Sequence, residues 1–550
     1  MRTGLFRLGF NFLIKTKLIL WLSLFFVSCA QIVAPTGGDK DVVSPKIIKS
    51  SPQNFAVNYK EKTFSLVFDE YIQVRNWNKV IFSPPLKSIS DYRLNGKKLT
   101  VSWEDTLLDN TTYTVNFGKS ILDNNEGNPL DSNLLVFSTG EKIDSSGISG
   151  IVANAIDHKA VKDVLIMLYK DNEDSLPFKK MPDYYSISDE TGKYRINHVK
   201  SGKYKLFALN DNNQNFLFDQ PDESIAFSDS IITIDTSIVI DHYLFKEESP
   251  KFFVKKAVVP HYGKVSVVMN KPSEKIVFES LRSDLKNENV LIETNFDKDS
   301  LSFWVLGNMP DSISLIIKNE RGFQDTLLID LPQNKDIESS KDKSLKRLKL
   351  SFSSYTSEGN PLDYGHSLKL EFNIPIAKSN FKNVILSNGT DTLKSRCFFD
   401  DDACRVLYID YPFHPDSSYK IFIPDSTFID VFGDYSDSIS FGFAVRNTDY
   451  YSTLSISIKN LNSNLSNMVQ LLDEKQLLVK EKFMNTNQKL VFDKLAPGKY
   501  FLKLIADKDK NGRWTTGKYI DKRQPESIYF YKDPINVKSN WDVDLEWELK

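Results

Sequence analysis

Residues 95–103 read Asn95-Gly-Lys-Lys-Leu-Thr-Val-Ser-Trp103, and they carry the clearest fold signal in the chain. Asn-Gly between two alternating runs is a strong hairpin signal, because tight two-residue turns need backbone angles that these residues adopt easily. Leu99, Val101 and Trp103 then alternate with polar residues, as in a strand with one buried face. Short runs of this kind recur along the chain. The sequence therefore predicts an all-β protein made of β-sandwiches in series.

Length and composition set the limits for this prediction. The chain has 550 residues, enough for several domains, and its 41% apolar and 26% charged residues exclude a collagen-like or wholly disordered protein. Aromatic residues make up 12% of the chain, which favours β-structure. The formal net charge is −2, so no basic field is present to recruit nucleic acid, and we exclude that partner class.

The sequence repeats itself. Residues 202–218 align without gaps to residues 498–514, and residues 222–227 align to 525–530 after an insertion of seven residues in the second copy. A second pair precedes each copy, with residues 64–69 similar to 368–373 and residues 112–115 similar to 418–421. A recurring block of this length indicates one structural unit used twice. We therefore expect five modules in an extended chain, at residues 44–141, 146–247, 250–335, 346–446 and 449–550.

The first module resembles a known family. Pro45 and Pro52 ahead of a strand, the motif Phe68-Asp-Glu70, the strand Thr112-Tyr-Thr-Val115 and the closing Phe137-Ser-Thr139 look like the bacterial immunoglobulin-like (Ig-like) domain of S-layer proteins. The fourth module keeps the strand motifs and Asp430-Val-Phe-Gly433 but lacks the proline pair and the final Phe-Ser-Thr. The resemblance implies an Ig-like sandwich in both places.

The second and fifth modules resemble another family. Gly147-Ile-Ser-Gly-Ile-Val152, Ser188-Asp-Glu-Thr-Gly-Lys-Tyr-Arg-Ile196 and Gly202-Lys-Tyr204 look like the carboxypeptidase regulatory-like, transthyretin-like sandwich. The resemblance implies a binding or spacer module and not the catalytic part of an enzyme. The third module carries strand candidates without a family assignment, and residues 336–346, rich in Lys, Asp and Ser, are expected to form a linker.

The N-terminus has the pattern of an export signal. Residues 1–28 contain four cations and no acid, and an apolar run of ten residues, 18–27, ends one residue before Cys29. Phe26-Val-Ser-Cys29 resembles a bacterial lipobox, which implies cleavage before Cys29, lipidation of that cysteine and a membrane anchor, with residues 29–43 as a tether. Ala30 is not the Asp that favours inner-membrane retention, so the resemblance implies the outer membrane. A plain secretory signal or an uncleaved anchor are the alternatives, and both faces of the membrane stay open.

Cleavage before Cys29 leaves a mildly acidic chain with a formal charge of −6. The two remaining cysteines, Cys397 and Cys404, flank Asp400-Asp-Asp402 between two strand candidates. In an oxidising compartment this predicts a disulfide across a hairpin. Two buried free thiols are the alternative.

The best candidate for a metal site is Asp507-Lys-Asp-Lys-Asn-Gly512. Asp507, Asp509 and Asn511 have the spacing of the first oxygen ligands of a calcium loop, and Gly512 stands at its sixth position. The twelfth position is Lys518, where a glutamate is required for an EF-hand. The earlier copy offers Asp211, Asn213 and Asn215, followed by Phe216 in place of glycine and by Asp219 and Asp222. The alternative is a loop rich in Asp and Asn whose side chains bond their own backbone.

No catalytic motif stands out. The six histidines are scattered, no G-x-S-x-G motif is present, and Gly118-Lys119-Ser120 lacks the upstream glycine of a phosphate loop. Asp69 and Glu70 are neighbours on a strand and so point to opposite faces, unlike the paired carboxylates of a glycosidase. A site assembled across modules stays open.

Aromatic pairs are the last functional hint. Tyr184-Tyr185, Tyr450-Tyr451 and Tyr529-Phe-Tyr531 suit stacking on sugar rings or anchoring a protein partner, and packing in sandwich cores is the alternative. We therefore expect a non-catalytic, lipid-anchored outer-membrane protein that acts in binding, adhesion or envelope scaffolding, with an unidentified protein or glycan partner. The alternative function is a glycan-capturing or hydrolytic envelope subunit with a site at a module junction.

Overall fold

The structure is a computed structural model of the chain. It describes residues 41–549 except 87–88, 132, 250, 274–275, 281–289, 295–298, 307–309, 320–321, 323, 332–348, 355, 357–359, 402 and 487–488. The export signal, Cys29 and the linker at residues 336–346 lie outside the described residues. Within the described part of the chain, no helix is long and apolar enough to span a membrane.

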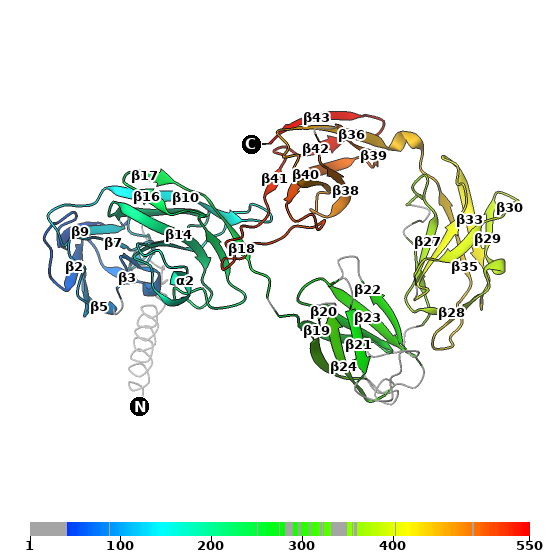
Figure 1. The fold of residues 1–550 in the computed structure, drawn as a ribbon, viewed down its shortest axis with the longest axis horizontal. Helices are drawn as coiled ribbons and strands as arrows, with labels where there is room; N and C mark the ends of the chain where they lie inside the picture. Colours follow the sequence, from blue (N-terminus) through cyan, green and yellow to red (C-terminus); the bar gives the residue numbers. More distant parts are fainter. Residues whose placement is uncertain are drawn as a thin grey trace, which may run out of the picture. The chain divides into compact units, whose positions relative to one another are not determined.

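The chain is a series of β-sandwich modules, as predicted (Figure 1). It divides into two compact units, with residues 1–146 and 197–200 in the first and all other residues in the second. The strands of the first module are β1 (Ile47–Ser51), β2 (Thr63–Phe68), β3 (Ile72–Val74), β4 (Ile81–Ser83), β5 (Ile89–Asn95), β6 (Lys98–Trp103), β7 (Thr112–Asn116), β8 (Ile121–Asp123) and β9 (Leu134–Ser138), with a short 3-10 helix, η2 (Trp77–Lys79). They form sheets in the orders β1-β2-β6-β5 and β4-β7-β9 and a two-stranded β3-β8 ribbon.

The Asn-Gly hairpin is confirmed. β5 and β6 pair antiparallel with Asn95 opposite Lys98, and Gly96 has φ +58°, a conformation that costs glycine little. Leu99, Val101 and Trp103 of β6 are buried in the first module's own core. The alternation read from the sequence therefore sets which face of this sheet is apolar.

The fourth module repeats the strand order of the first and adds one edge strand, β30, to the second sheet. Its sheets run β26-β27-β32-β31 and β30-β29-β33-β35, with a β28-β34 ribbon that corresponds to β3-β8. The bounds are β26 (Phe352–Ser353), β27 (Leu368–Phe372), β28 (Ile376–Ser379), η5 (Phe381–Asn383), β29 (Ile385–Asn388), β30 (Asp391–Leu393), β31 (Arg396–Phe399), β32 (Val406–Asp410), β33 (Ser418–Ile423), β34 (Phe428–Asp430) and β35 (Ile439–Ala444).

The second and fifth modules also share one topology. In the second, sheet neighbours run β12-β11-β14-β15, β16 joins β14, and β10 pairs parallel with β18. In the fifth, the order is β38-β37-β40-β41, β42 joins β40, and β36 pairs parallel with β43. The second module has β10 (Ser146–Asn154), β11 (Leu165–Tyr169), α2 (Leu176–Lys179), β12 (Tyr184–Ile187), β13 (Lys193–Val199), β14 (Gly202–Asn210), β15 (Ser224–Phe227), β16 (Ile232–Ile234), β17 (Ser237–Val239) and β18 (His242–Lys246). The fifth has η6 (Thr448–Tyr450), β36 (Ser452–Lys459), β37 (Ser466–Leu472), β38 (Leu478–Met484), β39 (Lys489–Leu495), β40 (Gly498–Asp507), β41 (Ile528–Phe530), β42 (Ile535–Val537) and β43 (Val543–Glu548).

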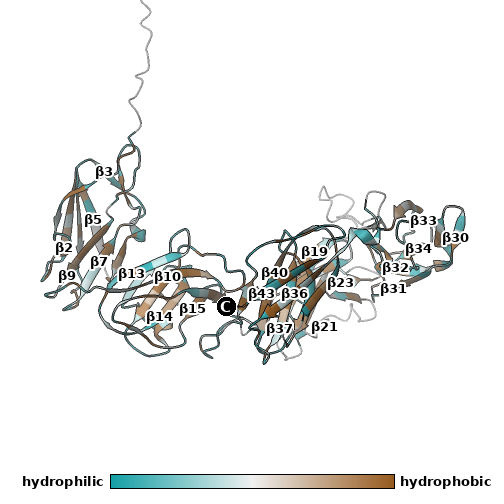
Figure 2. Cartoon of the chain, turned by 90° about the horizontal axis from the view of Figure 1, so that it is seen from above, coloured by the Kyte–Doolittle hydropathy of each residue, from teal (hydrophilic) through white to brown (hydrophobic). Residues whose placement is uncertain are grey.

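The third module is a smaller two-sheet sandwich. Its sheets run β19-β20-β23-β22 and β21-β24-β25. The strands are β19 (Val254–His261), β20 (Lys264–Met269), β21 (Ile276–Ser280), β22 (Val290–Thr294), β23 (Ser300–Val305), β24 (Ser312–Asn319) and β25 (Gln324–Asp330). Figure 2 shows apolar residues along the strands, for example in β14 and β15, and hydrophilic residues in the connecting loops. This pattern is what burial of one face of each sheet requires.

The predicted disulfide does not form. β31 and β32 pair as the sequence suggested, but their register places Ile409 opposite Cys397. Cys404 lies before β32 with φ +52°, outside the paired region, and no bond joins the two thiols. The prediction failed because it assumed a turn so tight that the cysteines faced each other. Burial instead raises the pKa of the Cys397 thiol above its ordinary value.

Asp123 organises the loop that follows β8. Its carboxylate accepts backbone N–H groups from Asn125, Glu126, Gly127 and Asn128 at 2.7–2.9 Å. Burial alone would raise the pKa of this carboxyl, but the four N–H groups favour the charged form and lower the pKa to about 2. The equivalent Asp430 in the fourth module accepts N–H groups from Phe432 and Asp434. One aspartate therefore organises the same loop in the first and fourth modules.

Asp123→Asn is expected to remove an acid-dependent part of the first module's stability. Because the folded pKa lies below the unfolded value of about 3.9, this stability is present above pH 4 and is lost as the pH falls toward 2. In calorimetry, wild type should therefore unfold at a higher temperature than the variant at pH 6, and the gap should close by pH 2. Asp109→Asn, at an exposed aspartate, is the control. A difference in unfolding temperature between wild type and Asp123→Asn that does not depend on pH would contradict the low pKa of Asp123.

Candidate functional site

The loop after β40 gathers the acidic residues singled out in the sequence. Asp507 ends β40 and is only 1% exposed, and its two carboxylate oxygens accept the backbone N–H groups of Asn511 at 3.1 Å and Gly512 at 2.9 Å. Gly512 has φ +75°, which lets the chain turn back over the carboxylate. Asp509 is exposed and accepts from the Asn511 amide and from the Thr515 hydroxyl at 2.8 Å.

Glu526 completes this cluster from a distance in sequence. It is 4% exposed, and its carboxylate accepts backbone N–H groups from Lys508 and, at 2.9 Å, from Thr515. Oxygen atoms of Asp507, Asp509 and Glu526 lie within 4.8 Å of one another, close enough to hold one cation. Burial, and then the Asp509 charge, raise the pKa of Glu526 above its ordinary value. Carboxylate oxygens are the ligands that calcium prefers.

The corresponding loop of the second module is organised in the same way. Asp211 accepts backbone N–H groups from Asn215 at 3.3 Å and Phe216 at 2.8 Å. Glu223, 1% exposed, accepts from Asn212, Asp219 and Gln220 at 3.0–3.3 Å. Asn213 and Asn215 donate their side-chain amides to Asp219 at 3.1 and 2.7 Å. In both loops the carboxylates thus accept N–H groups of their own loop, as in the Asx-loop alternative. What distinguishes the fifth-module loop is that, within the described residues, only there do three acids gather.

The sequence analysis did not single out the third acid of this cluster. It considered the twelfth position, where Lys518 and Asp222 stand, whereas the carboxylates that bond these loops are those of Glu526 and Glu223. The signal was present in the repeat, because Pro525-Glu526-Ser-Ile aligns with Asp222-Glu223-Ser-Ile. This glutamate is the same in both copies of the repeat although the residues before it differ, and this identity marks it as a residue with a shared role.

The seven-residue insertion of the fifth module falls within a longer loop, residues 513–526, which we call the docking loop. This loop contacts the second module, and Tyr519 at its tip is 2% exposed. The Tyr519 ring lies 5.1 Å from Phe227, 5.2 Å from Phe207 and 5.8 Å from Phe178, measured between ring centroids. A methyl group on Gly517 would approach the Phe245 ring to 2.6 Å, so the loop backbone sits directly on the second module. A single tyrosine therefore fills an aromatic box of a module nearly 300 residues away in sequence.

Polar contacts surround the buried tyrosine. The Thr516 hydroxyl donates to the Lys246 carbonyl at 2.7 Å, and the Tyr519 N–H donates to Glu247 at 2.6 Å. Gln524 donates its amide to the Phe227 carbonyl at 2.9 Å and to Asp229 at 2.6 Å.

An ion pair closes the rim of the same interface. Lys522 and Lys205 each lie 2.7 Å from the Asp174 carboxylate, and these contacts, that of Lys205 first, hold its pKa at about 2. Only the Tyr519 hydroxyl is buried without a hydrogen-bond partner among the described residues of this interface.

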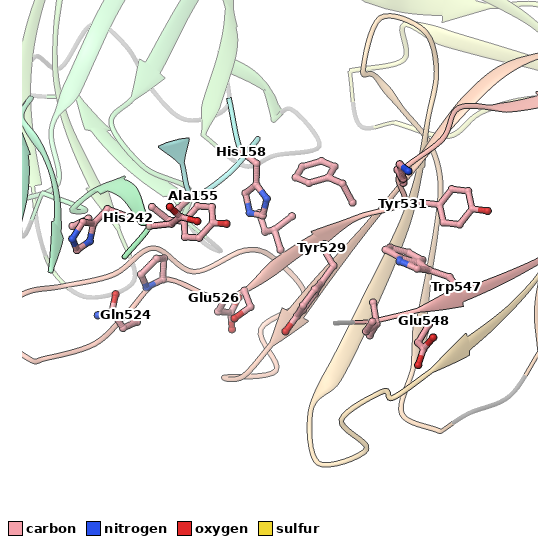
Figure 3. Close-up of a pocket in the computed structure, with 18 of the residues that line it drawn as sticks. Ala155, His158, His242, Gln524, Glu526, Tyr529, Tyr531, Trp547 and Glu548 are labelled. Atoms are coloured by element: carbon pink, nitrogen blue, oxygen red, sulfur yellow. The ribbon is translucent and has the colours of Figure 1, made fainter. Parts of the chain in front are cut away.

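A cavity of about 770 Å³ lies beside this interface (Figure 3). His158, His242 and Tyr243 of the second module and Tyr529, Tyr531 and Trp547 of the fifth are among the residues that line it. The His158 ring stands 4.7 Å from Tyr243 and 5.2 Å from Phe530, and Tyr531 stands 5.8 Å from Trp547. Gln524 and Glu526 of the docking loop also line the cavity, so docking builds one of its walls.

His242 is the unusual polar group of this cavity. It is 4% exposed and stacks on Tyr194 at 6.3 Å, and its Nε2 atom has no hydrogen-bond partner among the described residues. Burial lowers its pKa to about 4, so the imidazole is neutral near pH 7. His158 and His242 are far apart in the sequence, and both lie at this cavity only because β18 pairs with β10.

The other aromatic pairs serve packing. Tyr184 and Tyr185 are buried at 0% and 7% exposure, which confirms the core interpretation for that pair. Arg446 lies 4.3 Å from the Tyr450 ring centroid, and the Tyr451 hydroxyl donates to Asp363 at 2.7 Å. Tyr529 and Tyr531 are half-buried and line the cavity. Stacking on a ligand was one of the two interpretations of this motif in the sequence analysis.

Residues 41–139 match the bacterial Ig-like domain family. The match covers the first module and agrees with the resemblance read from its motifs. No curated protein matches the chain.

The comparison with solved structures found similar chains at low sequence identity. BcpA, the major pilin subunit of Bacillus cereus, is 10% identical over 74% of this chain and 99% of its own, with a TM-score of 0.15. The Bacillus anthracis TIE protein is 9% identical over 94% of this chain and 76% of its own, with a TM-score of 0.15. The surface layer protein SbsC, domains 1–6, is 12% identical over 86% of this chain and 67% of its own, with a TM-score of 0.13. At such low TM-scores these similarities carry no argument, and the match to the bacterial Ig-like family is confined to the first module.

Proposed function

We propose that the chain is a lipid-anchored protein of the bacterial outer membrane that acts without catalysis, as a scaffold whose modules present binding surfaces in the envelope. The observation that carries this proposal is the docking loop. An insertion that distinguishes the fifth module from its earlier copy is used to bury Tyr519 in the second module. The insertion therefore serves the contact between the fifth module and the second.

Two further observations support the scaffold. The bacterial Ig-like match in the first module and the repeated sheet topology of the later modules support a chain of β-sandwich modules in series. The N-terminal pattern of cations, a short apolar run and Cys29 supports the anchor, because three acyl chains at about 0.8 kcal/mol per buried methylene hold a protein on a membrane stably.

Cys29→Ser is expected to release the chain from the membrane. In a Gram-negative host, wild type should sediment with outer membranes and incorporate labelled palmitate, whereas the variant should do neither, because serine lacks the thiol that is acylated. Cys397→Ser is the matched control and should behave as wild type. Wild type recovered as an unlabelled soluble protein would contradict the anchor.

The cluster Asp507, Asp509 and Glu526 is our proposed calcium site. What supports it is the convergence of three carboxylates, two of them buried, around a tight Asx-rich turn. A cation there would favour the charged form of Glu526, whose pKa is raised by burial and, less, by the Asp509 charge. Its role would be to stiffen the base of the docking loop, since Glu526 ends that loop.

A further inference from the structure

We propose that the fifth module binds an extended, basic segment of a partner protein, which adds as a strand to the free edge of β41. The proposal rests on the binding role proposed above and names the chemistry of the partner. In this mode of recognition, main-chain hydrogen bonds hold the peptide and its alternate side chains give specificity. Such binding requires an unpaired strand edge, room beside it and a matching charge, and the fifth module offers all three.

The unpaired edge becomes evident when the fifth module is compared with the second. In the second module, β15 pairs with β14 on one side and with β18 on the other, where Ile225 lies opposite Phe245. β41 corresponds to β15, because residues 525–530 repeat residues 222–227. Within the described part of the chain, however, β41 pairs with β40 alone, and β43, which corresponds to β18, pairs with β36 alone. A seam that is closed in the second module is therefore open in the fifth.

The backbone of β41 directs hydrogen-bonding groups into this seam. The Tyr531 N–H donates to the Leu502 carbonyl of β40 at 3.0 Å. Successive residues of a strand direct their backbone groups to alternate sides, so those of Ile528 and Phe530 point away from β40. These are the groups that an added strand would bond.

Another edge of the same module is protected, which makes the open edge of β41 more notable. Edge strands attract foreign strands, and proteins often cover them with lysine side chains. Lys480 and Lys482 of β38 donate to the carbonyls of Asp493 and Val491 in β39. Among the described residues, no side chain covers the outward backbone groups of β41 in this way.

The cavity of about 770 Å³ provides the room. Every residue from 524 to 532 lines it, which includes the whole of β41, and residues 546–549 at the end of β43 line it as well. Figure 3 shows Tyr529 of β41 and Glu548 of β43 among the side chains around it. The volume lies within the usual range for ligand pockets, about 300–1,000 Å³. The space is therefore located where the strand edge is unpaired.

The charge at the cavity selects a basic segment. Its lining includes one lysine, Lys532, and four acids, which are Asp241, Glu526, Glu546 and Glu548. Glu526 is held by N–H groups of its own loop, whereas Glu548 is exposed and accepts a long amide contact, 3.4 Å, from Asn460. Acids in this excess attract a cationic partner and repel an anionic one. The second module agrees, because β18 places Lys246 next to Phe245 in the closed seam.

The test is calorimetric titration of the mature chain, residues 29–550 with Cys29→Ser for solubility. The probe is a capped hexapeptide of alternating lysine and valine. The comparison peptides are the same hexapeptide with every backbone nitrogen methylated, and a hexapeptide of alternating glutamate and valine. Methylation keeps the charges and removes the N–H donors, so it separates strand pairing from charge attraction. The basic hexapeptide should bind saturably, and both comparison peptides should bind at least about tenfold more weakly.

Hydrogen exchange on the wild-type chain reports the pairing directly. The Phe530 N–H, which points into the open seam, should exchange fast in the free chain and slowly with the basic hexapeptide bound. The Tyr531 N–H, which is bonded to Leu502, should exchange slowly in both states. This measurement needs no variant and so does not depend on how a substitution folds.

Two pairs of variants separate the backbone contribution from the charge contribution. Phe530→Pro removes the outward N–H at a position where an edge strand tolerates proline, and it should bind the basic hexapeptide about tenfold more weakly than Phe530→Ala, which keeps that N–H. Glu548→Lys should weaken binding by about fivefold, whereas Glu474→Lys, at an exposed acid in a turn of the same module, should not.

The proposal is overturned if the basic hexapeptide does not bind, if either comparison peptide binds as tightly, or if the Phe530 N–H gains no protection. It is also overturned if Phe530→Pro binds as Phe530→Ala does. Such a failure would leave membrane anchoring by Cys29 and docking by Tyr519 unaffected, since these are measured separately.

Discussion

Tyr519→Ala is expected to release the docking loop from the second module. Truncating a fully buried aromatic ring typically costs about 3–5 kcal/mol, and here that cost falls on the contact between the two modules. Hydrogen exchange of individual backbone amides should detect the release of the docking loop. The Tyr519 backbone N–H, which donates to Glu247 in wild type, should lose its protection, and the amides of β15 beside the aromatic box should exchange faster.

Tyr519→Phe is the matched control for this prediction. The Tyr519 hydroxyl is buried without a hydrogen-bond partner among the described residues, and burial raises its pKa to about 12. Phenylalanine keeps the ring and removes the unsatisfied oxygen, so docking should be as strong as in wild type or stronger. If alanine and phenylalanine had the same effect, the aromatic box would not be what holds the loop.

Calcium is expected to stabilise the fifth module, and Glu526→Gln should abolish this effect. At a concentration 100 times the dissociation constant, a bound ion adds about 2.7 kcal/mol to the free energy of unfolding. Wild type should therefore melt at a higher temperature in millimolar calcium than in chelator. The variant should not respond, because glutamine loses a charged ligand oxygen and turns an amide donor toward the N–H groups of Lys508 or Thr515.

The earlier copy supplies the control for the calcium experiment. Glu223→Gln makes the same change in the second module and should leave the calcium response of the fifth module intact. The response should also fade on acidification, because ligand carboxylates must be ionised and burial raises the pKa of Glu526 above its ordinary value. A melting temperature that ignores calcium in wild type, or a response kept in Glu526→Gln, would make the loop an ordinary turn.

Local patterns were predictable from the sequence, and contacts between distant segments were not. Asn95-Gly96 gave the β5–β6 hairpin, and the offset repeats gave the shared topology of the module pairs, because turn chemistry and alternation act over a few residues. The disulfide prediction was wrong by a register of a few residues, since Ile409 and not Cys404 lies opposite Cys397.

The site was only partly predictable. Asp507, Asp509 and Asn511 could be chosen from their spacing, but Glu526 reaches them only after the docking loop has turned back. Tyr519 stands in an insertion with no hydrophobic pattern, and nothing nearby in sequence indicates its aromatic partners in the second module. His158 and His242 likewise belong to one cavity only in the folded chain. Contacts of this kind depend on how whole modules meet.

Zero-length carbodiimide cross-linking of the purified mature chain tests the central claim most directly. Lys522 and Asp174 lie 2.7 Å apart across the docking interface, and Lys205 lies 2.7 Å from the same carboxylate within the second module, as an internal control. We predict an amide link between Lys522 and Asp174 in wild type that is lost in Tyr519→Ala while the Lys205 link persists. In a mixture of isotopically light and heavy chains, the link between Lys522 and Asp174 should join only two light or two heavy peptides, because it forms within one chain. A Lys205 link without a Lys522 link in wild type, or links between light and heavy chains, would contradict docking within one chain.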